Sequence, residues 1–354
     1  MTARTVLTVA GLTLREAARR RVVWALLALT VVLLALSAWG FSKLVGLDTE
    51  LGTMTSGEAR LVASLLLNLI MFGLSLIAAI GTAFLAGPTL AGELESGQAL
   101  VLLALSAWGF SKLIGLDTEL GTMTSGEARL VASLLLNLIL FGMSLIAAIG
   151  TAFLAGPTLA GEVDSGQALA LLARPVPRSA VLFGKWLGLV AFGGGYVVIA
   201  GLAQLLVVRV VVGYWPPAPA TGLALLAAET IVLLTLALLL SSVVSTMASG
   251  IVAVGLFGAT WVAGVVGGIG AALGNEGVAQ VGTVSRIILP TDGLWRGAMN
   301  AFQDPTALAQ MGPGEGGFPF LSASALTPAY LAWAAVWIAV VWGLTALSFS
   351  RRDV

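Results

Sequence analysis

Seven long apolar runs occupy most of this sequence and decide what the chain can fold into. They cover residues 22–41, 61–87, 130–156, 180–208, 221–246, 250–272 and 328–349. A helix needs about 20 apolar residues to cross the hydrocarbon core of a bilayer. Charged residues make up only 10% of the chain, far below the share of about 25% in soluble domains. The sequence therefore predicts an all-α fold, a polytopic bundle of transmembrane helices.

A block of 69 residues occurs twice in tandem. Residues 32–100 return as residues 101–169 with five substitutions, all of which preserve apolar or acidic character. A stacked repeat array needs at least three units, so the two copies indicate a tandem duplication or an error in gene assembly. The copied end of the first run, 99–111, reaches only about 20 Å as a helix. We expect it to cross with local thinning of the bilayer, because crossing keeps every later loop on its expected side. This gives a six-span core plus about two extra spans.

The distribution of Lys and Arg predicts that both termini are cytoplasmic. With the N-terminus inside, ten basic residues fall on the inner side and six on the outer side, as the positive-inside rule requires. Residues 1–21 combine helical apolar spacing with basic residues, which predicts a surface helix; the alternative is a frayed polar tail. Residues 22–354 then form the transmembrane domain, which contains both repeat copies and an outer loop at 275–327.

The residue types and motifs that the chain lacks exclude several kinds of catalytic, metal and nucleotide site. The chain has no Cys and no His, which excludes thiol nucleophiles, disulfides and His-based zinc sites. No basic cluster is large enough to bind nucleic acid. There is no Walker A pattern either, because Gly184-Lys185 is followed by Trp186. We therefore predict a protein that is not an enzyme and that carries no metal or cofactor of its own.

The most specific motif follows the run at 130–156. Glu162 and Gly166 lie in an E-x-x-x-G pattern, followed by R-P-V-P-R at 174–178 and by Gly184-Lys185. The N-terminal LREAARRRVVWALLAL, ILPTDGLWRGAM at 288–299 and FSRRDV at 349–354 accompany it. Together these stretches resemble the ABC-2 type permease family, the membrane subunits of ATP-driven exporters. The resemblance covers the whole chain once one repeat copy is discounted.

This resemblance implies a permease in a bacterial or archaeal plasma membrane, paired as a homodimer or heterodimer. ATP is then bound by a separate ABC ATPase, which docks on residues 158–178. The local sequence agrees, because Pro157 ends the preceding run and acidic residues favour the start of a helix. The alternative is an ordinary basic cytoplasmic loop. The predicted coupling residues are Glu162, Asp164, Gly166, Arg174, Pro175 and Arg178.

Two further groups of residues are candidates for function. Arg209 and Glu229 are ionisable residues within predicted spans, where charges usually pair or mark function. They either form an ion pair or extend separately to the outer interface. In the outer loop, Asp292 is predicted to cap a short helix that carries Trp295 and Arg296. That helix is expected to form a lid at the outer face.

Two other classes of function stay open. One is a non-transporting membrane scaffold for an ATPase. The other is an ion-coupled transporter, which predicts several acidic groups at mid-membrane depth, and the sequence supplies almost none. No polar constellation in the sequence selects a substrate.

Overall fold

The computed structural model describes residues 3–19, 31, 139–144, 178–212, 214–244, 246–272, 274–303, 322 and 325–351, with scattered positions on either side of 139–144 between 133 and 155. Every regular element in this part of the chain is a helix. Three predicted segments lie outside the described residues: the first span except for residue 31, the run at 61–87 and the short segment 99–111.

Four described helices are long and apolar enough to cross a membrane. They are α8 (Arg178–Val212), α9 (Pro219–Ser241), α10 (Thr246–Ala272) and α14 (Pro328–Arg351). Their positions confirm the last four predicted spans and the helical membrane bundle. The largest difference is at the end of α9, which stops at Ser241 instead of residue 246. A tight turn follows, in which the backbone N–H of Ser242 donates to the carbonyls of Leu238 and Leu239.

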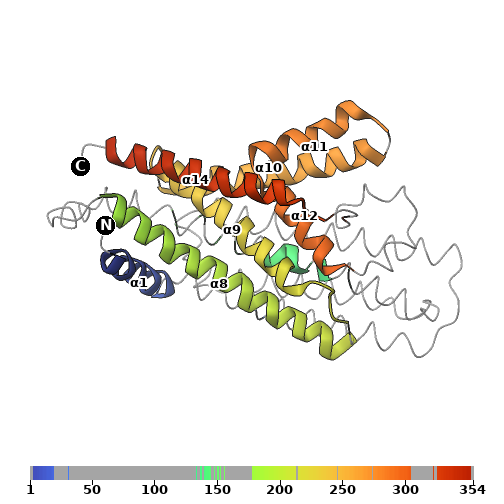
Figure 1. The fold of residues 1–354 in the computed structure, drawn as a ribbon, viewed down its shortest axis with the longest axis horizontal. Helices are drawn as coiled ribbons and strands as arrows, with labels where there is room; N and C mark the ends of the chain where they lie inside the picture. The colour runs from blue at the N-terminus through green and yellow to red at the C-terminus, as the bar shows by residue number, and fades with distance from the viewer. Residues whose placement is uncertain are drawn as a thin grey trace, which may run out of the picture.

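Helix α9 is the centre of the described bundle. Figure 1 shows it running between α8 and α14, with both chain termini at the same end of the molecule. It also contacts α10 and α12 (Thr291–Phe302), and it is the most buried of the four spans. Residues from the second repeat copy, among them Leu136, Leu140 and Phe141, belong to the same buried core. The core is therefore built around one helix that is apolar on all sides.

Helix α1 (Ala3–Arg19) packs across the first half of α8. Two glycines of α8 allow this close approach, because a Cβ at Gly184 or Gly188 would meet α1. Val6 is buried in this contact, whereas Leu7 and Leu12 are largely exposed. The helix is therefore amphipathic and has a second apolar face uncovered. Its predicted position at a cytoplasmic membrane surface stays a prediction.

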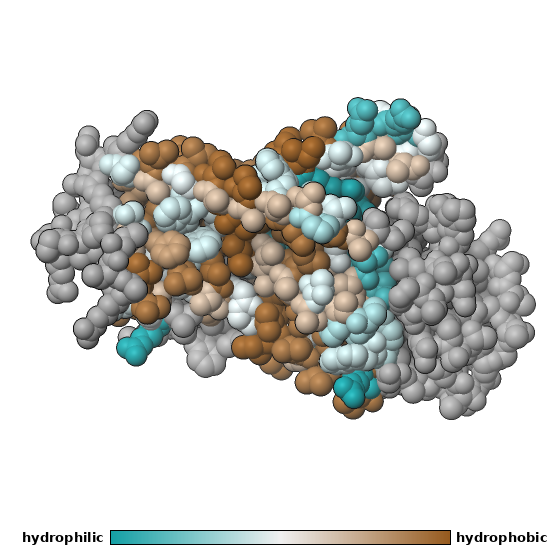
Figure 2. All heavy atoms as spheres, in the orientation of Figure 1, coloured by the Kyte–Doolittle hydropathy of each residue, from teal (hydrophilic) through white to brown (hydrophobic). Residues whose placement is uncertain are grey.

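The sides of the long helices are apolar on the outside as well as the inside. Figure 2 shows hydrophobic residues over much of the visible face, with hydrophilic residues at the tip of the hairpin formed by α10 and α11 (Glu276–Ile288). On α14 the exposed apolar residues include Leu331, Val336, Val340, Leu344 and Leu347. Such large apolar faces mark contact with lipid or with another protein.

Candidate functional site

The α10–α11 hairpin brings two helices into close contact. Gly274 at its tip has φ of +69°, a left-handed conformation that favours glycine. The next residue, Asn275, caps α11 by accepting a hydrogen bond from the backbone N–H of Val278 at 3.2 Å. A Cβ at Gly267 would lie 2.5 Å from the Cα of Gly282. The hairpin therefore depends on small residues where the two backbones meet.

The end of α11 is fixed to α14 by aromatic side chains. Its last carbonyls, at residues 286–288, accept hydrogen bonds from Tyr330 Oη, Trp333 Nε1 and Trp337 Nε1, at 3.0, 3.2 and 2.8 Å in that order. A helix leaves its last four carbonyls without partners, and such groups are costly where water is excluded. The spacing of the donors places all three on one face of α14. This face therefore satisfies the end of a helix that does not cross the membrane.

Asp292 lies at the centre of a small charged cluster. Its side chain is 1% exposed, and its Oδ2 accepts hydrogen bonds from Arg286 Nε at 2.8 Å and from Arg296 Nε at 3.0 Å. Arg296 also donates from Nη2 to the carbonyl oxygen of Gly264 at 2.8 Å. A Cβ at Gly264 would overlap the Asp292 carboxylate. The cluster thus joins the end of α11, the start of α12 and the middle of α10.

This geometry corrects two predictions for the outer loop. Asp292 does not cap α12, because Pro290 is the N-cap residue and no side-chain cap bond is present. The helix is not a surface lid either, since most of its residues are buried. Trp295 is 1% exposed, and its ring centroid lies 5.0 Å from that of Phe141. The apolar side chains of α12 are better satisfied inside the bundle than at an aqueous face.

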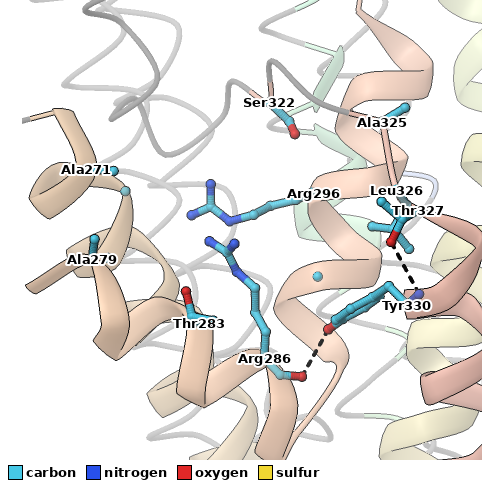
Figure 3. Close-up of a pocket in the computed structure, with 13 residues that line it drawn as sticks. Ala271, Ala279, Thr283, Arg286, Arg296, Ser322, Ala325, Leu326, Thr327 and Tyr330 are labelled. Carbon is cyan, nitrogen blue, oxygen red and sulfur yellow. Dashed lines mark hydrogen bonds between the residues drawn. The ribbon is translucent and has the colours of Figure 1, made fainter. Parts of the chain in front are cut away.

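A cavity of about 450 Å³ opens beside the charged cluster. Its walls come from the α10–α11 hairpin, from α12 and from the start of α14 with the residues before it. Figure 3 shows the guanidinium groups of Arg286 and Arg296 extending from their helices toward the same open space. The polar residues that line it are Thr283, Arg286, Arg296, Ser322, Thr327 and Tyr330.

The charged groups beside this cavity have a net positive charge. Two arginines share one aspartate, so the cluster carries a net charge of +1. Asp292 engages only the Nε atom of Arg286. Among the described residues no acceptor meets the Nη atoms of that arginine, which line the cavity. The lining holds no Cys or His, and the arrangement is suited to binding rather than to nucleophilic catalysis.

Of the two alternatives for Arg209 and Glu229, the ion pair is not formed. The guanidinium of Arg209 lies 5.2 Å from the ring centroid of Trp215. Glu229 is buried, and its Oε2 accepts a hydrogen bond from Ser144 Oγ at 2.7 Å. Arg209 is three residues before the end of α8, whereas Glu229 is ten residues into α9, about 15 Å along the helix. The two groups therefore lie at different depths, and Glu229 does not extend to the interface.

The predicted coupling residues fall almost entirely outside the described residues. This holds for Glu162, Asp164, Gly166, Arg174 and Pro175. Arg178 is the first residue of α8. Their role in coupling stays a prediction.

The sequence reasoning missed Arg286, Tyr330 and Gly264 as site residues. Asp292 and Arg296 are four residues apart on one helix, a spacing that favours an ion pair. Arg286 is close in sequence, and its proximity to Asp292 was the available signal. No local pattern identifies Gly264 or Tyr330, because each reaches the site only through tertiary packing.

Comparison with family models identifies the wider relationship. The model for the ABC-2 family transporter protein matches residues 7–354, nearly the whole chain. The chain belongs to the ABC-2 transporter family. This confirms the resemblance found in the sequence, and both repeat copies lie within the matched region. Neither the search of curated proteins nor the search of solved structures gives a match.

Membership and structure together define the coarse function of this ABC-2 protein. Its described spans and its family make it a multi-pass membrane protein and a permease component of an ABC transporter. Such permeases are transport subunits that typically work with an ABC ATPase. The cavity beside Asp292 lies in the part of the chain between its last two described spans, α10 and α14.

Proposed function

We propose that this chain is the permease subunit of an ABC exporter, driven by a separate ATPase that docks on residues 158–178. Family membership carries this proposal. The arrangement of the helices also supports the proposal. Helix α1 and the start of α8 lie together at the end of the bundle that holds both termini (Figure 1). This end holds Arg15, Lys185 and Arg178, the last residue of the docking segment. By the positive-inside rule it is the cytoplasmic end, so both termini are cytoplasmic.

Helix α8 is suited to carry movement from the ATPase into the bundle. It is a continuous helix of 35 residues that starts at the end of the docking segment. Its first half is held by α1, and its length packs against the central helix α9. A push on residues 158–178 would therefore move α8 and α1 together against α9, as packed helices shift in other switching proteins. ATP binds in the partner subunit, and two permease chains form the path.

The ion-coupled alternative has one structural observation in its favour. Glu229 is a buried carboxyl near the middle of α9. It is the one acidic residue buried at mid-helix depth in the described spans; its Oε2 accepts a hydrogen bond from Ser144, and its Oε1 has no partner among the described residues. A single group does not form a relay across the membrane, so we retain the ATP-driven function.

The repeat supplies a matched test of the docking segment. Glu93 and Glu162 occupy the same place in two copies of the sequence PTLAGE, but only the second copy leads into R-P-V-P-R. We would purify the permease with its partner ATPase, and measure co-purification and ATP hydrolysis. Glu162→Lys should abolish stimulated hydrolysis without affecting membrane insertion, whereas Glu93→Lys should leave hydrolysis unchanged.

Two outcomes would reject this assignment. Normal hydrolysis and co-purification in the Glu162→Lys variant would show that the ATPase does not dock there. Loss of hydrolysis only in the Glu93→Lys variant would move docking to the first copy. A scaffold without transport activity would couple to the ATPase but would not move any substrate in reconstituted vesicles, which separates it from a permease.

A further inference from the structure

We propose that the cavity between the α10–α11 hairpin, α12 and α14 binds an anionic group, a phosphate or a carboxylate, between Arg286 and Arg296. The inference concerns binding at the end of the bundle away from the termini. It does not depend on coupling to an ATPase, so each proposal can fail without the other.

The charge balance around the cavity is the first argument. Asp292 is fully enclosed and neutralises one of the two arginines that contact it. A charge in a partly buried site is stabilised when it is paired and hydrogen-bonded. Arg296 already uses Nη2 on the carbonyl of Gly264, whereas Arg286 engages its described partner only through Nε. A second anion in the cavity would complete the pairing of the cluster.

The geometry of the arginines is the second argument. Their guanidinium groups approach the same space from two different helices (Figure 3). A planar guanidinium donates two parallel hydrogen bonds to a carboxylate or phosphate. Asp292 holds both groups through Nε, which fixes their orientation before a ligand arrives. The site is therefore preorganised, and little side-chain order has to be gained on binding.

The shape of the cavity is the third argument. Its volume of about 450 Å³ is within the usual range for small-molecule sites. Small residues on α10 and α11, such as Gly268, Ala271 and Ala279, leave this space open. The hydroxyl of Thr283 lines it from the same face of α11 as Arg286, and it can donate a further hydrogen bond to an anion.

Two sources can supply the anion. Ile287 is 53% exposed on the flank of α11 beside the cavity-lining residues, whereas Val281, Val284 and Ile288 are exposed on the face of the helix away from the cavity. An anionic lipid could place its head group in the cavity and its chains along the flank at Ile287. A free anion in solution would use the arginines alone. Both sources share the same phosphate or carboxylate chemistry, and the experiment separates them.

The test measures binding by the full-length chain. Purified protein in a neutral detergent would be titrated with inorganic phosphate at constant ionic strength, with thermal unfolding followed by tryptophan fluorescence. The same protein would be placed in nanodiscs of phosphatidylcholine, with and without phosphatidylglycerol. We expect stabilisation by phosphate, by phosphatidylglycerol or by both. Arg286→Gln should weaken the apparent affinity by about tenfold or more, since charge-assisted bonds are lost.

Two further variants keep the test decisive. Arg209→Gln removes a positive charge that lies outside the cavity, over Trp215, and it should behave like the wild type. Ala325→Phe fills the rim of the cavity and leaves both arginines in place. It should abolish binding even if Arg286→Gln fails to fold.

The pattern of responses identifies the source or rejects the site. A response to phosphate that Ala325→Phe removes supports a free anion, and a response limited to phosphatidylglycerol supports a lipid head group. The proposal is overturned if neither probe stabilises the wild type. It is also overturned if Arg209→Gln weakens binding as much as Arg286→Gln, or if Ala325→Phe binds normally.

Discussion

Replacing Asp292 by Asn should strongly destabilise the fold. The substitution keeps the shape of the side chain but removes the counterion that Arg286 and Arg296 share. Removing one partner from a buried ion pair costs about 3–5 kcal/mol. Two features reduce this cost: the Arg286 side chain is 30% exposed, and the Asn oxygen can still accept one hydrogen bond. We therefore expect a loss of roughly 2–3 kcal/mol.

The two arginines should not contribute equally. The Arg296 side chain is 13% exposed and donates to both Asp292 and the carbonyl of Gly264. Arg286 is more exposed and, within the described part of the chain, donates to Asp292 alone. Arg296→Gln should therefore destabilise the protein more than Arg286→Gln, because more buried hydrogen bonds are lost.

Reversible unfolding in mixed micelles, followed by tryptophan fluorescence, would measure these differences. Glu276→Gln is the matched control, because this exposed residue at the tip of the α10–α11 hairpin also carries one negative charge. It should change stability by less than about 0.5 kcal/mol. A loss for Asp292→Asn no larger than that of the control would refute the role of the cluster. A larger loss for Arg286→Gln than for Arg296→Gln would refute the assigned order.

Three further predictions follow from the packing and from the repeat. Gly264→Ala should destabilise the protein by about 1–3 kcal/mol, because its Cβ would overlap Asp292. Gly258→Ala is the control on the same helix: its Cβ would have open space, so it should be neutral or slightly stabilising in the same unfolding assay. Because Arg209 and Glu229 have different partners, the effects of their Gln substitutions on stability should add within about 0.5 kcal/mol in a double-mutant cycle. A clearly larger coupling energy would show that the two side chains do form an ion pair. Deleting residues 32–100 leaves 285 of the 354 residues and rejoins one uninterrupted first span. The shortened chain should insert, dimerise and stimulate the ATPase at least as well as the full-length protein. Loss of that activity would show that the extra copy is functional.

The second copy of the repeat contributes to the described core. Ser144 reaches Glu229 on the central helix, and Leu140 and Phe141 are buried in the core. These contacts place the described residues of the second copy in the core of the bundle. The corresponding run of the first copy lies outside the described residues, so the deletion tests whether this copy is the surplus one.

The sequence alone determined the membrane class and the positions of the described spans. Crossing a bilayer requires a run of apolar residues of fixed minimum length, and this requirement is local. The ends of α8, α9, α10 and α14 could therefore be predicted to within about five residues. The motif around Glu162 and the R-P-V-P-R stretch likewise identified the family, which the family match confirms.

Only the tertiary structure decided how the segment between α10 and α14 packs and which partners its charged residues have. A polar residue in an outer loop can cap a helix, face water or enter an ion pair, and its neighbours in sequence do not choose among these. Here the glycines of α10 let α11 fold back closely, and the aromatic donors of α14 satisfy its last carbonyls. Asp292 is thereby enclosed between two arginines, and α12 is buried instead of exposed. Burial and pairing depend on contacts between distant segments, so these features could not be read from local sequence patterns.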